Sequence, residues 1–392
     1  MGNGRSSVKY FIENRTNEIY FVIENYKKPL ELNLANNNAI ENIKYPNYKM
    51  KHKIIQLLIL VLTLALSGCK NYKTIDAYVD EINQKGELNG NVLVIKNKEI
   101  LYENSFGIAH PKTKEPLTAN HRFAIGSISK EFPGVAVMQL YERGNLKLED
   151  KVSTYLKNLP AWASTISIQQ LFKYTSGLPR VAWERYGENE MTVTHELLLN
   201  DLKKVEQLAF EPGTDYLYSN YNPILLIHIV EEVSGQSFED YVTQNIFIPS
   251  KMTNSYFGKA TPWKNETLPA YPFDKDKHLD AFKMDGIKFL MLFTAQDIYQ
   301  YLQHLHSYQL LSKESIKLLS EREGSQSPLG VLEWDGDKLE VHHHHGEQGS
   351  YEAVIRYFPE EEVYIIILKN QKFFNVMDMA DKIKNIITQK NI

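Results

Sequence analysis

The sequence Arg122-Phe123-Ala124-Ile125-Gly126-Ser127-Ile128-Ser129-Lys130 is the stretch from which the rest of the chain can be interpreted. Ser127 and Lys130 stand three residues apart, and the apolar run 135–140 that follows them predicts a buried helix. In a helix this spacing puts both side chains on one face. The lysine can then accept the proton of the serine hydroxyl, and the free N–H groups at the helix start can stabilise an oxyanion. Because Ser-x-x-Lys is common by chance, other landmarks must decide its meaning.

Composition and charge indicate the broad class of the chain. Of its 392 residues, 43% are hydrophobic and 23% are charged, which is typical of a globular protein with a large core. The 44 Lys and Arg residues against 48 Asp and Glu give a net charge of −4, so we expect no nucleic-acid partner. Cys69 is the sole cysteine, which excludes an intramolecular disulfide and a cysteine-rich metal site.

Residues 50–69, MKHKIIQLLILVLTLALSGC, have the pattern of a lipoprotein signal peptide. Two lysines follow Met50, and the apolar run Ile54–Leu66 is too short to span a membrane but suits a signal peptide. The end of the stretch, Leu-Ser-Gly-Cys69, resembles a bacterial lipobox. The resemblance implies cleavage before Cys69 and lipidation of its thiol, which would anchor the exported protein in the cell envelope, facing the periplasm or the cell surface. The alternative is a buried helix with an incidental cysteine.

Residues 1–49 precede this signal peptide, although a signal peptide belongs at an N-terminus. The segment is rich in Asn, Tyr and charge and shows no helical or alternating period. We interpret it as a non-native upstream extension from a mis-assigned start codon, with translation beginning at Met50. The alternative is a poorly ordered tail. Either way it is left out of the fold prediction.

The body of the chain, residues 75–390, is predicted to form one domain with strands at both ends. Residues 91–95 and 100–102 flank a polar turn and predict a hairpin, and residues 146–249 are mainly helical in pattern. Near the end, strands are predicted at 338–345, 351–358 and 363–368, with a turn at 346–349 and a last amphipathic helix at 376–387. This order predicts an α/β (α+β) fold: a central antiparallel sheet from both chain ends, flanked by helices, with a helical subdomain.

Several landmarks in order make the chain resemble the serine β-lactamase and DD-peptidase superfamily, and most closely its class C β-lactamase-like branch, which also contains esterases and D-aminopeptidases. The resemblance covers roughly residues 85–370. The landmarks are Phe123-x-x-Gly126-Ser127-x-Ser129-Lys130, the stretch Leu146–Val152, the Thr-Ser-Gly-Leu loop within Tyr174–Pro179, the Pro212-Gly213-Thr214 turn before Tyr218-Ser219-Asn220, and the His-x-Gly form of the third motif at His344-His345-Gly346. A β-lactamase/transpeptidase-like fold is therefore expected.

The resemblance implies a serine hydrolase that cleaves amide or ester bonds through an acyl-enzyme. Ser127 would be the nucleophile and Lys130 its proton acceptor or electrostatic partner. Tyr218 would act as general base in acylation and help to activate water in deacylation. Asn220 would hydrogen-bond the acyl side of the substrate.

The third motif would complete the site. The oxyanion hole would consist of the backbone N–H groups of Ser127 and of Glu347, the residue after Gly346. His344 stands where many members carry the lysine that meets a substrate carboxylate. A neutral His344 and an acidic Glu347 favour neutral esters or amides over anionic β-lactams.

The run His342–His345 allows a different interpretation, a metal site. Strand alternation puts His342 and His344 on one face, but two histidines at this spacing need further ligands. Hydrolysis by serine and lysine needs no metal, so we expect no metal and no cofactor. We also expect a monomer that acts on a small-molecule or peptide substrate.

The resemblance leaves the substrate open. Tyr174 replaces the histidine that usually precedes the Thr-Ser-Gly loop, and Glu347 replaces a small residue. D-Ala carboxypeptidase and β-lactamase activities are therefore alternatives. A penicillin-binding sensor that is acylated without turnover is a further alternative, of another class.

Overall fold

The structure, a computed structural model, describes the chain in two units, Met1–Asn71 and Tyr72–Ile392. In the first unit it describes only three strands, β1 (Val8–Glu13), β2 (Glu18–Ile23) and β3 (Glu31–Asn33), which pair in that order as an antiparallel sheet. In the second unit it describes residues 72–188, 191–257, 268–280, 284–285, 287–288, 291–373 and 375–389.

The first unit therefore contains strands where the sequence showed no periodic pattern. Whether translation starts at Met50 is a separate question, and that start stays a prediction. The proposed signal peptide at 50–69, with Cys69, lies outside the described residues. Within the described part of the chain, no helix combines the length and the apolar character needed to cross a membrane.

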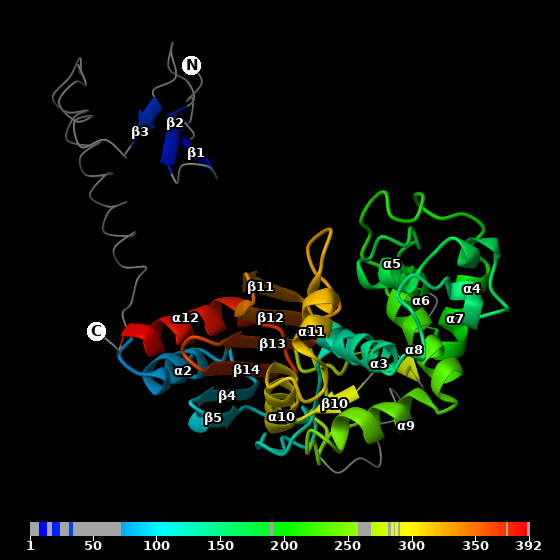
Figure 1. Ribbon diagram of the computed structural model, residues 1–392. Helices are drawn as coiled ribbons and strands as arrows, with labels where there is room; N and C mark the ends of the chain where they lie inside the picture. Colours follow the sequence, from blue (N-terminus) through cyan, green and yellow to red (C-terminus); the bar gives the residue numbers. More distant parts are fainter. Residues whose placement is uncertain are drawn as a thin grey trace. The chain divides into compact units, whose positions relative to one another are not determined.

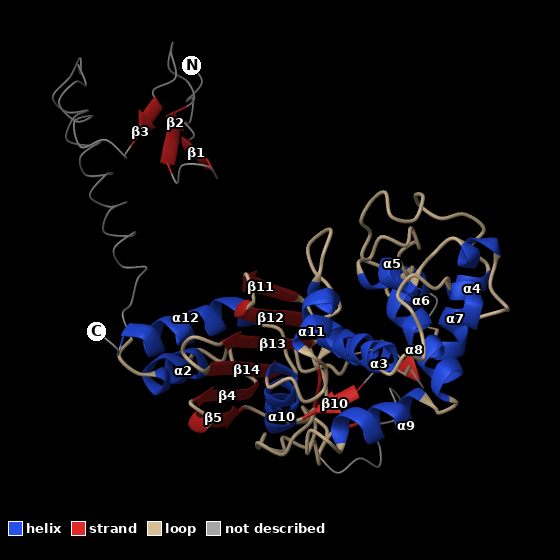
Figure 2. Cartoon of the chain, viewed as in Figure 1, coloured by secondary structure: helices blue, strands red, loops and turns tan. Residues whose placement is uncertain are grey.

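A six-stranded antiparallel sheet organises the second unit, in the order β11-β12-β13-β14-β4-β5 (Figure 2). Its strands are β4 (Gly90–Lys96), β5 (Glu99–Phe106), β11 (Val331–Asp335), β12 (Lys338–Gln348), β13 (Tyr351–Phe358) and β14 (Val363–Lys369). The first and last strands of the domain meet directly, because β4 pairs with β14 in a register that sets Val92 opposite Ile367. The predicted sheet built from both chain ends is confirmed.

The hairpin β4–β5 follows from its local sequence. Its turn residues Asn97 and Lys98 both have positive φ, 53° and 66°, as a two-residue turn of the type that matches strand twist requires. Val and Ile side chains on β4 and β14 are buried on both faces, which explains the continuous apolar runs of these central strands.

Helices cover both faces of the sheet (Figure 1). On one face, α2 and α12 pack over a core that includes Val92, Val354 and Ile365. The other face carries the larger core around Leu93, Ile355 and α3. The helices are α2 (Ile75–Gln84), η1 (Gly126–Lys130), α3 (Glu131–Glu142), α4 (Val152–Tyr155), η2 (Ala161–Ser164), α5 (Ile168–Phe172), α6 (Trp183–Glu188), α7 (His195–Lys203), α8 (Tyr221–Ser234), α9 (Phe238–Val242), η3 (Thr243–Phe247), α10 (Ala295–His306), α11 (Lys313–Ser320) and α12 (Val376–Gln389).

Elements α4 to η3 form the predicted helical subdomain, and α8 packs along α3. Short strands complete two small sheets. They are β6 (Phe123–Ala124), β10 (Met291–Phe293) and β8 (Tyr256–Phe257) in one sheet, and β7 (Val193–Thr194) with β9 (Met284–Asp285) in the other. A central antiparallel sheet flanked by helices, with a helical subdomain, is the architecture that the sequence predicted.

One predicted boundary was wrong, and it matters for the site. Strand β12 continues through Gly346 and Glu347 to Gln348, so no turn begins at Gly346. The turn lies instead at Gly349, which has a φ of +54°, and Ser350, whose backbone and hydroxyl both donate to Asp280. A glycine inside a strand resembles a turn in sequence, but here it marks a close approach of another backbone.

Candidate active site

Ser127 lies near the start of η1, the short helix that leads into α3, and it is held between two other predicted residues. The sequence predicted an α-helix from about Ser127, and the structure has one turn of 3-10 helix first, Gly126–Lys130, followed by α3. The Lys130 ammonium nitrogen donates to Ser127 Oγ at 3.1 Å, and the Tyr218 hydroxyl donates to the same oxygen at 2.9 Å. Lys130 Nζ also lies 5.2 Å from the centre of the Tyr218 ring. The structure thus brings together residues from two separate motifs, Ser127 and Lys130 from the first and Tyr218 from the other.

Two glycines let strand β12 touch η1. A Cβ atom on Gly346 would lie 2.0 Å from the Ile125 carbonyl oxygen and 2.8 Å from Ser127 N. A Cβ on Gly126, whose φ is +54°, would lie 2.4 Å from Glu347 N. Neither position has room for a side chain, so both need glycine. The contact sets the backbones of Ser127 and Glu347 side by side, as an oxyanion hole made of their N–H groups requires.

A cavity of about 350 Å³ opens over the nucleophile. Its lining consists of Ser127, Tyr218, Ser325, Gln326, His345 and Glu347. Asn220 is not part of this lining, although its backbone precedes the first turn of α8. The substrate contact expected of Asn220 therefore stays a prediction. Ser325 and Gln326 belong to the loop before β11, and the sequence offered no pattern that would have identified them.

The domain matches the model of the Beta-lactamase family over residues 75–388. The chain belongs to the Beta-lactamase family. It is a serine hydrolase of that family.

Among curated relatives, penicillin-binding protein 4* of Bacillus subtilis is 27% identical over 335 residues, which cover 76% of this chain and 72% of the relative. The protein flp of Staphylococcus aureus strain COL is 30% identical over 200 residues, 49% of this chain and 39% of the relative.

Solved structures share the fold. A penicillin-binding protein from Bacillus halodurans has a TM-score of 0.70 at 21% identity and matches 81% of this chain and 100% of its own. A class C β-lactamase has a TM-score of 0.65 at 21% identity, with 79% and 94% covered. The D-amino acid amidase of Ochrobactrum anthropi SV3, solved with L-phenylalanine amide, has a TM-score of 0.66 at 17% identity, with 81% and 99% covered.

We expected His344 to occupy the position from which many members of the family contact a substrate carboxylate. The structure places its side chain elsewhere. Its side chain is buried, and its Nδ1 lies 2.8 Å from Glu131 Oε1. It does not line the cavity; the neighbouring His345 does. Because β12 continues as a regular strand, alternation turns His344 inward and His345 to the other face.

Glu131 is the main residue that sequence analysis missed. It directly follows Lys130 and has no exposed surface. An acidic residue at the head of a strongly apolar run was a detectable hint, because a buried carboxylate needs donors around it. The sequence could not show which donors these are, since His344 lies 213 positions away.

The outer face of β12 carries a second polar cluster. The ligand atoms of His345, Glu347 and Glu352 all lie within 4.8 Å of one another, a spacing that a cation could use. Both carboxylates, however, already have lysine partners. Glu347 accepts from Lys372 Nζ at 2.6 Å, and Glu352 from Lys369 Nζ at 3.4 Å. A cation would have to displace both lysines, so we do not assign these side chains as metal ligands.

Tyr174, which replaces the usual histidine, supports the site from behind. Its ring is buried and packs 4.8 Å from the Tyr218 ring, centre to centre. Its φ of +55° is unusual for a bulky residue, and hydrogen bonds fix its backbone to Leu171 and Leu217. The ring therefore limits where Tyr218 can move.

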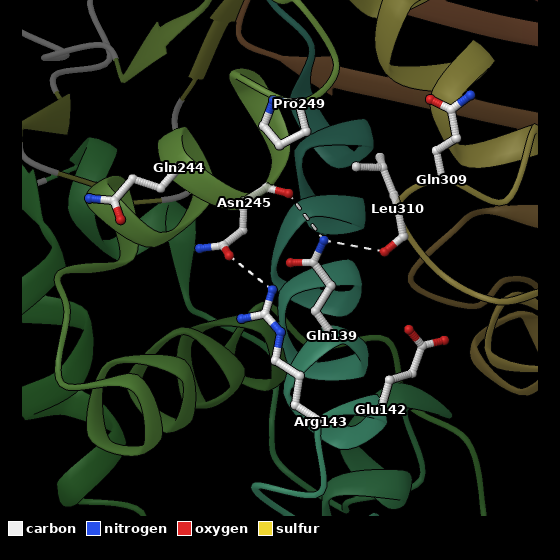
Figure 3. Close-up of a pocket in the computed structure, with 8 residues that line it drawn as sticks. All are labelled: Gln139, Glu142, Arg143, Gln244, Asn245, Pro249, Gln309 and Leu310. Carbon is white, nitrogen blue, oxygen red and sulfur yellow. Dashed lines mark hydrogen bonds between the residues drawn. The ribbon is translucent and has the colours of Figure 1, made fainter.

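A further cavity of about 320 Å³ lies beside the C-terminal half of α3 (Figure 3). Gln139 ties the neighbouring segments together there, because its amide donates to the carbonyls of Asn245 at 3.1 Å and Leu310 at 3.3 Å. Arg143 donates to the Asn245 side chain at 2.9 Å. These bonds hold α3 between η3 and the segment that joins α10 to α11, and none of the residues predicted for catalysis lines this cavity.

Proposed function

We propose that this serine hydrolase cleaves small neutral acyl esters or amides through an acyl-enzyme on Ser127. One observation carries the proposal: Ser127 Oγ accepts hydrogen bonds from both Lys130 and Tyr218, and Ser127 lines an open cavity. In the resting arrangement both side chains donate to Oγ. For attack, one of them must be deprotonated, so that it can take the serine proton as Oγ bonds to the acyl carbon.

The backbone supplies the remaining element. The N–H groups of Ser127 and Glu347 would hold the oxyanion of the tetrahedral intermediate, and one such donor is worth about 100- to 1000-fold in rate. Tyr218 would then help a water molecule to attack the acyl-enzyme.

The preference for a neutral substrate rests on the charges at the cavity. Of the residues that line it, Glu347 is acidic and only His345 can become cationic. The nearest lysines of the cluster are paired, Lys372 with Glu347 and Lys369 with Glu352. A substrate carboxylate would thus find no free lysine among these groups. The pairing with Lys372 also weakens the repulsion by Glu347, so the preference should be modest.

The names of the relatives support the alternatives. Penicillin-binding proteins and a class C β-lactamase point to a D-Ala carboxypeptidase or a β-lactamase, and the D-amino acid amidase points to neutral amides. A penicillin-binding sensor would be acylated once and then stop. A stoichiometric burst without a steady state would identify the sensor.

The test combines labelling and turnover. The purified protein is incubated with a fluorophosphonate probe, and the modified residue is located by peptide mass spectrometry, with the Ser127→Ala variant as the control. Hydrolysis of neutral p-nitrophenyl esters, D-Ala peptides and cephalosporins is then compared. Label on a serine other than Ser127 would refute the mechanism. A higher kcat/KM for a cephalosporin than for every neutral ester would make β-lactamase the better description.

We also propose that the mature protein is a monomer that starts at a lipidated Cys69 and is anchored in the bacterial cell envelope. The support is the pattern of residues 50–69. The intact mass of the native membrane protein tests the lipid and the start site together. Recovery of residues 1–49 in that protein would contradict the proposal.

A further inference from the structure

A loop forms one side of the catalytic cavity. Residues 321–326, called the cavity loop below, follow α11 and precede β11, and two of them, Ser325 and Gln326, line the cavity together with Ser127. None of the residues 321–326 belongs to a helix or a strand. Because regular backbone hydrogen bonds do not fix the shape of the loop, contacts from outside must hold it in place.

Tyr216 makes such a contact from the helical subdomain. It lies between α7 and α8, and its hydroxyl oxygen is 3.0 Å from Ser325 Oγ, where either group can donate the hydrogen bond. A Cβ atom on Gly324 would lie 2.5 Å from the Tyr216 ring, so the ring packs directly against the backbone of the loop. Tyr216 therefore contacts two successive residues of the cavity loop, one by packing and one by a hydrogen bond.

Tyr216 is itself held in place. Its ring packs edge-on against the buried ring of Tyr174, with 6.2 Å between the centres, and its backbone N–H donates to Asp215 Oδ1 at 2.7 Å. The next residue, Leu217, donates its N–H to the Tyr174 carbonyl at 2.9 Å. Because Tyr174 also packs on Tyr218, one buried ring supports both the residue that holds the cavity loop and the residue that bonds the nucleophile.

A second connection reaches the start of the cavity loop. Lys173, next to Tyr174, forms ion pairs with Glu321 at 2.9 Å and with Glu323 at 3.2 Å. Both carboxylates are about half exposed, and ion pairs in such surroundings contribute little. Tyr216 is therefore the main contact for the part of the loop that lines the cavity.

We propose that Tyr216 is a positioning residue for substrate binding: through Ser325 it holds the cavity loop, and with it one side of the catalytic cavity, against the helical subdomain. Tyr216 does not line the cavity itself. Ser325 and Gln326 are neutral and can form hydrogen bonds, so the side that they form suits the polar, uncharged part of an ester or amide. This inference rests on the proposed function.

Loss of the contact should weaken substrate binding and leave the chemical step unchanged. The hydrogen bonds to Ser127 Oγ come from Lys130 and Tyr218 and do not involve the Tyr216 hydroxyl. An interaction that stabilises the bound substrate and the transition state equally affects KM and not kcat when it is removed. One hydrogen bond of this kind is worth about two- to tenfold in an equilibrium.

The first test compares Tyr216→Phe with the wild type on a neutral p-nitrophenyl ester. The phenylalanine keeps the ring that packs on Gly324 and Tyr174 and removes only the hydroxyl. We expect KM to rise by about two- to tenfold and kcat to stay within about twofold of the wild type. An unchanged KM, or a fall in kcat as large as the rise in KM, would overturn the proposal.

Ser325→Ala shows whether Tyr216 acts through Ser325, because it removes the same hydrogen bond from the other side. In the Ser325→Ala protein, the further change Tyr216→Phe should leave KM where it is, since the bond is already lost. If Tyr216→Phe raised KM by the same factor in both backgrounds, the two residues would act independently and the proposal would be overturned.

Tyr155→Phe is the matched control. The Tyr155 hydroxyl donates to Asp150 Oδ2 at 2.6 Å within the same helical subdomain, and neither residue lines the cavity. This variant should therefore keep the KM of the wild type. A rise in KM as large as that of Tyr216→Phe would indicate a general loosening of the subdomain, which also contradicts the proposal.

Limited digestion with trypsin tests the loop without any measurement of activity. Arg322 is exposed and is the one trypsin site within residues 321–326. Cleavage after Arg322 should be about two- to tenfold faster in Tyr216→Phe and in Ser325→Ala than in the wild type, and unchanged in Tyr155→Phe. Folded variants that are cut at the wild-type rate would overturn the proposal.

These measurements also separate the two proposals. Ser325 is exposed, so Ser325→Ala is expected to fold, and its digestion decides the matter if Tyr216→Phe does not fold. A wild type that is never labelled at Ser127 by a fluorophosphonate probe refutes the proposed function instead, and digestion at Arg322 still tests the contact between Tyr216 and the cavity loop.

Discussion

Two networks of carboxylates and histidines in this protein, one buried and one half-buried, use the same chemistry for different ends. The first lies around Glu131, which directly follows Lys130; its carboxylate pairs with His344 and His342, and His342 contacts His306. Around Glu231 in the helical subdomain, His195 Nε2 lies 3.0 Å from His228 Nε2, and Glu231 pairs with His228 and Lys288. Perturbed histidines and carboxylates alone therefore do not mark a catalytic site. What distinguishes the first network is its position, because Glu131 directly follows Lys130, which donates to Ser127 Oγ at the edge of a cavity.

This difference predicts that changes near the first network affect rate, whereas changes in the second affect stability alone. Each prediction below tests that separation.

Ser127→Ala should have the largest effect. Loss of the nucleophile should reduce hydrolysis by about a million-fold, as expected when a group on which the whole mechanism depends is removed. Because Ser127 Oγ only accepts bonds from Lys130 and Tyr218, both networks stay intact. The melting temperature should therefore change little. If the variant were inactive because it is unfolded, calorimetry would show a much lower melting temperature than for the wild type.

Tyr218→Phe and Lys130→Ala should each lower kcat/KM by about 100- to 10,000-fold, the range for a positioned acid–base group. Tyr218→Phe keeps the ring that packs on Tyr174 and removes only the hydroxyl that bonds Ser127 Oγ. Stability should thus be preserved. Steady-state kinetics at neutral pH would measure both losses, and full activity of Lys130→Ala would show that the Ser-x-x-Lys interpretation is wrong.

Glu347→Ser changes the outer face of β12 and should have a small effect on the choice between anionic and neutral substrates. The substitution removes a negative charge from the cavity wall and frees Lys372. Activity on anionic substrates should rise relative to neutral ones by at most about fivefold, since a half-exposed charge at 4 Å is worth about 1 kcal/mol or less. Ratios of kcat/KM for matched neutral and anionic esters would measure the change.

The double variant Glu347→Ser with Lys372→Ala is the control. It removes both charges of the pair, so most of the gain should disappear. A gain that persists would mean that side-chain size, and not charge, controls the cavity.

The sequence was sufficient for the parts of the molecule that depend on local pattern. Alternation and apolar runs predicted the strands from both chain ends, and spaced motifs predicted Ser127, Lys130 and Tyr218. Alternation placed His342 and His344 on one face of the strand, but the direction of that face depended on partners far away in the sequence, Glu131 and His306. The course of β12 through Gly346 likewise depended on its contact with Ile125. The same holds for Glu131, whose burial could be suspected but whose partners on β12 and α10 are set by tertiary packing.

The last prediction addresses the second network, where only stability should respond. Burial and the nearby charges of His228 and Lys288 lower the pKa of His195 to about 3. In the unfolded chain the pKa of a histidine is about 6.5. Between these values the unfolded state binds a proton that the folded state does not, so the free energy of unfolding falls as the pH drops from about 6.5 towards about 3, by about 1.4 kcal/mol per pH unit for one proton. His195→Gln removes this titration while it keeps a polar partner for His228. Urea unfolding of the variant should therefore show a shallower loss of stability with acid than the wild type, and its kcat/KM at neutral pH should equal that of the wild type. An equal acid slope would mean that His195 is protonated in the folded state, and a lower kcat/KM would mean that the two networks are coupled after all.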